Sequence, residues 1–390
     1  MEGDEKYITG VELKQHNKEG DLWISIQGKV CNVSDWAHEH PGGDVPLLNL
    51  AGQDVTDAFI AYHPGTAWQY LDKFFTGYYL KDFKVSETSK DYRRLASEFA
   101  KLGLFEKKGH ITMYALASIA LMFCVVLYGV LCCQSVWAHL GSALVLGFLW
   151  IQSSYIGHDS GHYQVMKSRG YNKFAQFVSG NCLTGISMAW WKWTHNAHHL
   201  ACNSVDYDPD LQHIPFFARK FPDRALNILG ILIFWTWFPL LVSCLPNWPE
   251  MVMYVLASFA VTAIQHVQLC LSHFAADVYT GPPKGNDWFE KQTAGTLDIS
   301  CSSWMDWFYG GLQFQLEHHL FPRMPRGQLR RVSPLVQDLC KKHNLSYRSL
   351  SFWEANVWTI RRLRNVAQQA RDLSNPVPKN MLWEAVNTHG

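Results

Sequence analysis

A chain of 390 residues is long enough for two or three domains. Its 34 Lys and Arg balance 33 Asp and Glu, and the resulting net charge of +1 argues against a nucleic-acid partner, which would favour a basic surface. Hydrophobic residues make up 48% and Trp alone numbers 17, a composition that is unusual for a soluble enzyme and typical of membrane interfaces. The mean hydropathy of −0.10 requires a polar part beside any membrane part.

The N-terminal stretch is acidic and lacks the apolar core of a signal peptide, so we expect membrane insertion to use internal segments. The ten cysteines show no CxxC pair and no spacing typical of a disulfide framework. We therefore expect reduced thiols in a chain that is exposed to the cytosol.

Residues 1–82 are predicted to form a small α+β domain, with a short helix at 11–16 and strands at 23–26 and 29–33. The motif His40-Pro41-Gly42-Gly43 forces a tight turn, and its glycines let the backbone approach a bulky partner closely. His63 is the next candidate partner, and apolar residues between the two histidines would line a flat slot. Such a slot fits a haem held by two imidazoles, although Pro-Gly-Gly by itself also occurs in plain turns.

This domain resembles cytochrome b5. His40 matches the histidine of the HPGG motif in that family, and His63 matches its second axial ligand. The resemblance implies a haem b bound by His40 and His63. Two axial imidazoles fill the coordination sphere of the iron, so the expected task of this haem is to pass single electrons.

Four apolar stretches can each cross about 30 Å of hydrocarbon, which needs about 20 residues. Residues 83–110 are predicted to be a linker that ends in an amphipathic helix at 92–102, and the semi-apolar segment 174–191 to be a helix lying on or dipping into the membrane face. We predict an all-α membrane domain over 111–350 and cytosolic C-terminal helices over 351–390, with amphipathic cytosolic helices at 328–343 and 352–373. The four predicted transmembrane helices are 111–133, 136–157, 225–245 and 251–273.

Positive charge predicts the orientation of these helices. No Lys or Arg lies between Lys108 and Lys167, or between Arg224 and Lys284, so both hairpin tips lack positive charge. By the positive-inside rule, the segments before, between and after the hairpins face the cytosol. The haem domain, the C-terminus and all the histidine clusters described next are then predicted to lie on one side of the membrane.

Three clusters place His or Gln side chains at i and i+4, or at i, i+3 and i+4, positions that share one face of a helix. Imidazole suits Fe, Zn, Cu and Ni as a ligand. Chance or a polar core role explains one such cluster, but three at matching spacing on one side of a membrane indicate a metal site. The candidate catalytic and metal-binding residues are His158 and His162; His195, His198 and His199; and Gln315, His318 and His319.

This set offers too many donors for one ion of four to six ligands and enough for two non-haem irons. A zinc hydrolase would normally show a carboxylate base such as the Glu of HExxH. Within the clusters, the only nearby acids in the sequence are Asp159 and Glu317. We predict that they face away from the imidazoles and orient the ligand rings by hydrogen bonds. Removing hydrogen from an unactivated methylene needs a strong oxidant. We therefore favour O2 activated at iron, with electrons delivered by the fused haem domain at high effective concentration.

Residues 111–350 resemble the membrane fatty-acyl desaturase family, whose boxes are H-x3-4-H, H-x2-3-HH and H/Q-x2-HH. The fused haem domain and Gln315 resemble the front-end desaturases, and the box sequences resemble those of the plant sphingolipid Δ8 desaturases. The resemblance implies a substrate that is a long-chain base or ceramide, an endoplasmic reticulum membrane, and cytochrome b5 reductase as electron donor. It also implies a further metal ligand at His273, whereas His266 is expected to be a buried helix residue.

One departure from the family is a shortened segment near Ala218, beside the expected substrate entrance. Beside the Δ8 desaturase, four alternatives stay open. They are a front-end fatty-acyl desaturase of the Δ6 type, a lipid hydroxylase, a zinc hydrolase, and a membrane-anchored electron carrier whose di-iron half is inactive.

Overall fold

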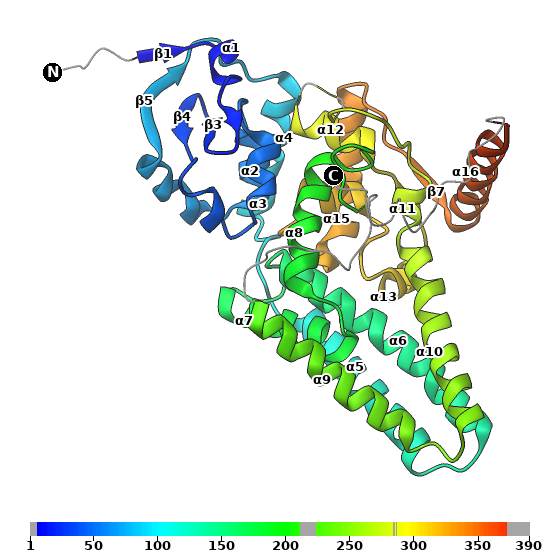
Figure 1. The fold of residues 1–390 in the computed structure, drawn as a ribbon. Coiled ribbons are helices and arrows are strands. Elements are labelled where there is room, and N and C mark those ends of the chain that lie inside the picture. The colour runs from blue at the N-terminus through cyan, green and yellow to red at the C-terminus, as the bar shows by residue number, and fades with distance from the viewer. Residues whose placement is uncertain (1–5, 211–223, 284, 286, 373–390) are drawn as a thin grey trace.

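The computed structural model describes residues 6–210, 224–283, 285 and 287–372 (Figure 1). An N-terminal α+β domain lies beside one end of a long helical half, and the hairpins of the helical half extend away from it. The predicted shortening near Ala218 falls outside the described residues.

The N-terminal domain is built on a five-stranded sheet in the order β1-β5-β4-β3-β2. The β1–β5 pair is parallel and the other pairs are antiparallel. Leu22, Ile24 and Ile26 are buried in the core of this domain, which confirms the predicted α+β class. Its elements are β1 (Lys6–Ile8), α1 (Gly10–Leu13), β2 (Asn17–Lys18), β3 (Asp21–Ile26), β4 (Lys29–Asn32), the 3-10 turn η1 (Ala37–Glu39), α2 (Val45–Leu50), α3 (Thr56–Tyr62), the 3-10 helix η2 (Gly65–Lys73) and β5 (Phe75–Leu80).

Helix α4 (Glu87–Lys101) starts earlier than predicted, because Ser86 caps it by accepting a hydrogen bond from the backbone of Ser89. Its Tyr92 and Phe99 are fully buried in a core that also includes Ala58 of α3 and residues of the helical half. Burying one such large side chain contributes about 1.5–3 kcal/mol. This shared core holds the N-terminal domain against the helical half.

Among the described residues, four helices are long and apolar enough to cross a membrane, as predicted. Large apolar side chains on their outer faces are exposed, as expected for helices that face lipid. The predicted fourth span is too long, because the helix turns at Cys270 and His273 lies on a separate short helix. Apolar residues continue through this turn, so composition does not mark it. The four helices are α5 (His110–Leu131), α6 (Val136–Gly161), α9 (Arg224–Ser243) and α10 (Trp248–Leu269).

Segment 174–191, which we predicted to be one helix, is divided. Helix α7 (Arg169–Gln176) passes into the π-helical turn η3 (Phe177–Cys182), and α8 (Met188–Ala201) begins only after a break. Gly185 has φ +71° at this break, and a Cβ there would approach Phe234 Cδ1 to 2.6 Å. Only glycine fits such a position without strain. The break starts α8, which carries the second histidine cluster.

The remaining elements form a cap over the end of the spans (Figure 1). Strands β6 and β7 pair in parallel, and the predicted C-terminal helices are present as α15 and α16. The elements of the cap are α11 (Leu271–Phe274), α12 (Trp288–Gly295), β6 (Asp298–Ser300), the 3-10 turn η5 (Ser303–Met305), α13 (Asp306–Tyr309), α14 (Gln315–Leu320), α15 (Arg326–Lys342), β7 (Ser349–Ser351) and α16 (Phe352–Asp372).

Candidate metal centre and haem slot

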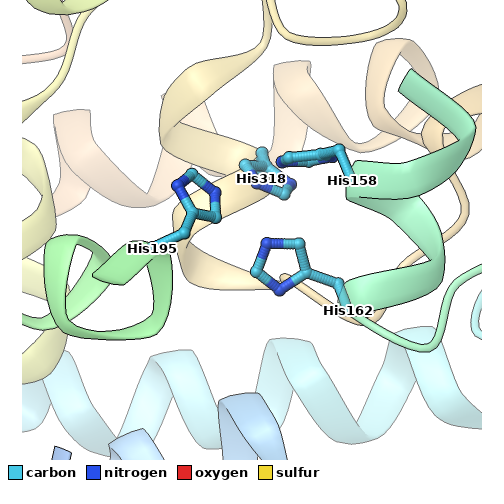
Figure 2. Close-up of side chains that lie close together, drawn as sticks. All are labelled: His158, His162, His195 and His318. Carbon is cyan, nitrogen blue, oxygen red and sulfur yellow. The ribbon is translucent and has the colours of Figure 1, made fainter. Parts of the chain in front are cut away.

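The first group of imidazoles gathers His158, His162, His195 and His318, whose rings point toward a common space (Figure 2). They come from the end of α6, from α8 and from α14. One ligand nitrogen of each lies within 4.8 Å of the others. Three of these rings have a buried Nε2 with no hydrogen-bond partner among the described residues, namely His158, His162 and His318. Buried polar nitrogens without partners are costly unless they coordinate a metal, so this group fits a metal ion.

The second group contains His198, Cys202, His273 and His319, whose ligand atoms also lie within 4.8 Å of one another. The amide nitrogen of Gln315 lies 2.7 Å from Nε2 of His273 and 3.1 Å from Nε2 of His319. The amide oxygen and nitrogen can be exchanged by rotation, so Gln315 can turn an oxygen donor toward the same place. Cys202 was not predicted, although it lies four residues after His198, the same spacing that defines the histidine clusters.

His199 connects the two groups. Its Nε2 lies 3.0 Å from Nε2 of His195 in the first group, and its ring stacks on that of His319 in the second at 4.0 Å between centroids. Its Nδ1 is buried without a hydrogen-bond partner among the described residues. The three predicted clusters and His273 therefore form one continuous buried region. This donor set of imidazoles, an amide and a thiol fits two irons placed side by side.

Carboxylates outside this region hold several of the rings. Nδ1 of His198 lies 2.8 Å from Asp208, and Nδ1 of His195 lies 3.2 Å from Asp210. Such contacts fix the tautomer and leave Nε2 free to bind a metal. The prediction that Asp159 and Glu317 are the only nearby acids is therefore wrong, because the loop after α8 folds back over that helix. A pair of aspartates two positions apart, shortly after the second cluster, was the signal for them.

Of the two acids that we predicted to orient ligand rings, only Asp159 does so. Its Oδ1 lies 3.0 Å from Nδ1 of His158, and its Oδ2 accepts a hydrogen bond from Arg326. The carboxyl of Glu317 instead accepts a hydrogen bond from Tyr347 at 3.1 Å. Glu317 faces the core under α15, where burial raises its pKa well above the usual value. It supports α14 rather than a histidine ring.

The protonation of the rings suits metal binding, which requires neutral imidazole. Burial lowers the pKa of His162, His199, His318 and His319 well below the usual value, and the neighbouring histidines add to this effect. His198 is different. Burial lowers its pKa too, but Asp208 and then Cys202 and Asp210 outweigh that effect and raise the pKa well above the usual value. A bound cation would replace that proton.

His266 does not belong to this region. It lies on an exposed face of α10, so our expectation of a buried residue is wrong. Its Nε2 is 3.8 Å from the sulfur of Cys270. The turn at Cys270 separates His266 from His273, which would otherwise share one helix.

The predicted haem slot lies in the N-terminal domain. The rings of His40 and His63 face each other at 6.0 Å between centroids. Nδ1 of His40 bonds to the carbonyl of Gly43 at 2.6 Å, and Nδ1 of His63 bonds to that of Phe59 at 3.2 Å. Both rings line a cavity of about 1180 Å³, whose other walls include Leu47, Leu71 and many further apolar side chains. Two imidazoles with engaged Nδ1 atoms in an apolar cavity fit a haem bound through both Nε2 atoms.

Comparisons with known proteins agree with both sites. Residues 9–80 match the family of cytochrome b5-like haem/steroid binding domains, and residues 135–243 and 223–351 match the fatty acid desaturase family. The chain is 63% identical to the Delta(8)-fatty-acid desaturase 2 of Arabidopsis thaliana, over 99% of this chain and 98% of that protein. That alignment spans 442 positions, more than the 390 residues of this chain, which agrees with the predicted shortening.

Two further relatives differ in their described substrates. The chain is 54% identical to an acyl-lipid (9-3)-desaturase of Borago officinalis, over 99% of each chain. It is 31% identical to a Delta 8-(E)-sphingolipid desaturase of Emericella nidulans, over 60% of this chain and 54% of that protein. With its four candidate spans, its histidine-rich centre and its haem slot, the chain belongs to the fatty acid desaturase family, as a membrane desaturase with a fused cytochrome b5-like domain.

Proposed function

We propose that this enzyme introduces the Δ8 double bond into the long-chain base of a sphingolipid, with ceramide as the substrate. The observation that carries the proposal is the convergence of eight histidines and Gln315 in one buried region next to a haem slot. The relatives support the position of the double bond, since the Arabidopsis thaliana protein at 63% identity is described as a Delta(8) enzyme. The Emericella nidulans relative supports a sphingolipid as the substrate.

We assign the ligands by the two groups described above. His158, His162, His195 and His318 would hold one iron, while His198, His273 and His319 would hold the other, with Gln315 beside them. His199 lies between the two groups and completes the catalytic set. His40 and His63 would bind the haem iron. The buried nitrogens without partners support the first assignment most directly.

The iron pair, when bound, supplies the oxidant that removes two hydrogens from neighbouring methylenes. The overall reaction consumes one O2, two electrons and two protons, and releases two waters for each double bond. The residues of the chain prepare this step. Asp208 and Asp210 hold the rings of His198 and His195, and Arg326 holds Asp159 against His158. The burial of all these rings excludes bulk water from the site.

We further propose that the histidine region, the haem domain and both termini face the cytosol, in the endoplasmic reticulum membrane. Two arguments support this orientation. Both hairpin tips lack Lys and Arg, and the haem domain and histidine region lie at the same end of the four spans (Figure 1). Cytochrome b5 reductase, which works on that side, would then be the electron donor to the haem.

A front-end acyl desaturase is the second candidate, because the Borago officinalis acyl-lipid enzyme is 54% identical over nearly the whole chain. One experiment separates the candidates. The full chain is expressed in a yeast that lacks Δ8 bases, and both the long-chain bases and the fatty acids are analysed. We expect Δ8-unsaturated bases, which should be absent from cells that express His198→Ala. New double bonds in fatty acids alone would favour the second candidate, and unchanged lipids with normal haem would favour the electron carrier.

A further inference from the structure

The haem slot is not closed within the N-terminal domain. The cavity that holds His40 and His63 continues into the helical half, where Gly161, His162 and Leu200 also line it. Its volume of about 1180 Å³ exceeds the roughly 300–1,000 Å³ of ordinary small-molecule pockets. One space therefore extends from the haem ligands to the first histidine cluster.

The wall that the helical half contributes is strongly basic. Among the described residues it contains a single acid, Glu106, against five cations. Haem b carries two carboxylates on one edge, and burying them requires positive partners. The five cations are Lys107, Lys167, Arg169, Lys192 and Arg323.

Tyr163 gathers two of these cations. Nζ of Lys192 donates a hydrogen bond to the hydroxyl of Tyr163 at 2.9 Å and lies 4.4 Å from the centre of its ring. The guanidinium of Arg169 lies 5.6 Å from the same ring. Tyr163 has φ +57°, an uncommon conformation for an aromatic residue, and it directly follows His162. Unfavourable backbone conformations persist where the surroundings enforce them, often at functional sites.

Arg323 provides a third cation in the wall of the cavity. It donates a hydrogen bond to the backbone carbonyl of His63, and its guanidinium lies 5.8 Å from the ring of Phe105. Neither Arg323 nor the two cations at Tyr163 form an ion pair with a carboxylate in the described part of the chain. Their charge is therefore available to a ligand in the cavity.

The haem ligands His40 and His63 line the same cavity as Arg169, Lys192 and Arg323. A direct contact also fixes the two halves here, because Nδ2 of Asn196 donates to the carbonyl of Gly42 at 3.0 Å.

We propose that the two halves share one haem site, in which Arg169, Lys192 and Arg323 of the desaturase half bind the haem carboxylates. The proposal rests on the ligation by His40 and His63 given above, and goes beyond it by making haem retention depend on docking. Cations next to the carboxylates also favour the ferrous state, because that state carries one positive charge less. Removing them should therefore loosen the haem and lower its reduction potential.

The test compares full-length protein in lipid nanodiscs with the double variant Arg169→Gln/Lys192→Gln. Lys173→Gln is the matched control, because Lys173 lies exposed on the same helix as Arg169 and outside the cavity wall. The rate of haem transfer to a haem-free globin and the midpoint potential are measured. A charged hydrogen bond contributes enough to expect roughly tenfold faster haem loss in the double variant, together with a lower potential. The control should match the unaltered protein. The single variant Arg169→Lys, which keeps the positive charge, should retain haem much better than the double variant does.

Haem dimethyl ester, which lacks both carboxylate charges, identifies the group that the cations bind. We expect the unaltered protein to lose the ester faster than it loses haem. This difference should be much smaller in the double variant, in which only Arg323 of the three remains. Equal retention of haem and ester by the unaltered protein would overturn the proposal, as would a double variant that behaves like the control. The low-spin spectrum of two imidazole ligands is recorded in each case. Loss of that spectrum in the unaltered protein would contradict the ligation by His40 and His63, and so the proposed function rather than the binding of the carboxylates.

Discussion

Trp193 of α8 donates a hydrogen bond from Nε1 to Oδ1 of Asp44 at 3.1 Å, and so joins the second histidine cluster to the haem loop. Gly43 lies next to this bond with φ +90°, and a Cβ on it would approach Cδ1 of Trp193 to 2.6 Å. Glycine is therefore required here both by the backbone conformation and by the neighbouring domain. His40 and His195 lie only a few residues from this contact, on either side of it. The contact thus provides a short connection between the haem and the metal centre.

Trp193→Phe is expected to slow electron transfer from the haem to the metal centre. The ring still fills the space, but the bond to Asp44 is lost, which costs about 1–2 kcal/mol of docking. Stopped-flow measurement of haem reoxidation in the presence of substrate and O2 checks this, and the haem spectrum should not change. Trp137→Phe, at an exposed position at the other end of the spans, serves as the control. Equal reoxidation rates in the two variants would show that this contact does not govern transfer.

His198→Ala should abolish turnover and leave the haem spectrum intact, because His198 belongs to the metal centre and does not line the haem cavity. Loss of a residue that only supports a metal ligand typically lowers metal affinity roughly 10–100-fold. Loss of the ligand itself should cost at least as much. Iron analysis should then find less than two non-haem irons beside one haem. Undiminished product from this variant would exclude the second cluster from the mechanism.

Asp208→Asn tests the carboxylate that holds the ring of His198. The carboxylate is fully buried and lies 2.8 Å from Nδ1, so its loss should reduce iron affinity by about 10–100-fold while the fold is kept. Iron retention during dialysis against a chelator measures this. Asp206→Asn is the matched control, because Asp206 is exposed and bonds to the backbone of Gly281. If both variants retain iron equally, Asp208 has no role at the metal centre.

Local patterns in the sequence were enough to predict the spans and the three clusters. The predicted spans are long, largely apolar runs without charged residues, and His195, His198 and His199 share a helical face that the structure retains. The break at Gly185 and the turn at Cys270 depend on tertiary packing, here against Phe234 and the histidine region, which no local pattern records. Asp208 escaped prediction for a related reason. It lies in a loop, where no periodicity shows which side chain will turn back onto a helix.

Contacts between the two halves were equally absent from the sequence pattern. The amphipathic helix around Tyr92 was predicted as part of a linker, yet it is buried between the haem domain and the third cluster. The hydroxyl of Tyr92 donates a hydrogen bond to the carbonyl of Leu320, more than two hundred positions away in the chain. Amphipathicity indicates that one face of a helix will be covered, but it does not indicate by what.

Haem retention is expected to depend on pH in a direction that follows from His63. Burial, with a further contribution from His40, lowers the pKa of His63 from about 6.5 to about 3. Between these values the unfolded chain binds a proton that the folded domain does not, so stability rises with pH in this window and is lost as pH falls from about 6.5 toward 3. A protonated imidazole also cannot ligate iron.

The Soret absorbance of the full-length protein should therefore stay constant near pH 7 and fall on acidification within that window. His38→Gln is the control, because His38 is exposed in the same loop and does not line the cavity. It should release haem at the same pH as the unaltered protein. His63→Ala should lack the low-spin spectrum at every pH. If the unaltered protein keeps its Soret band unchanged down to pH 3, the buried imidazoles do not set the acid limit of this domain.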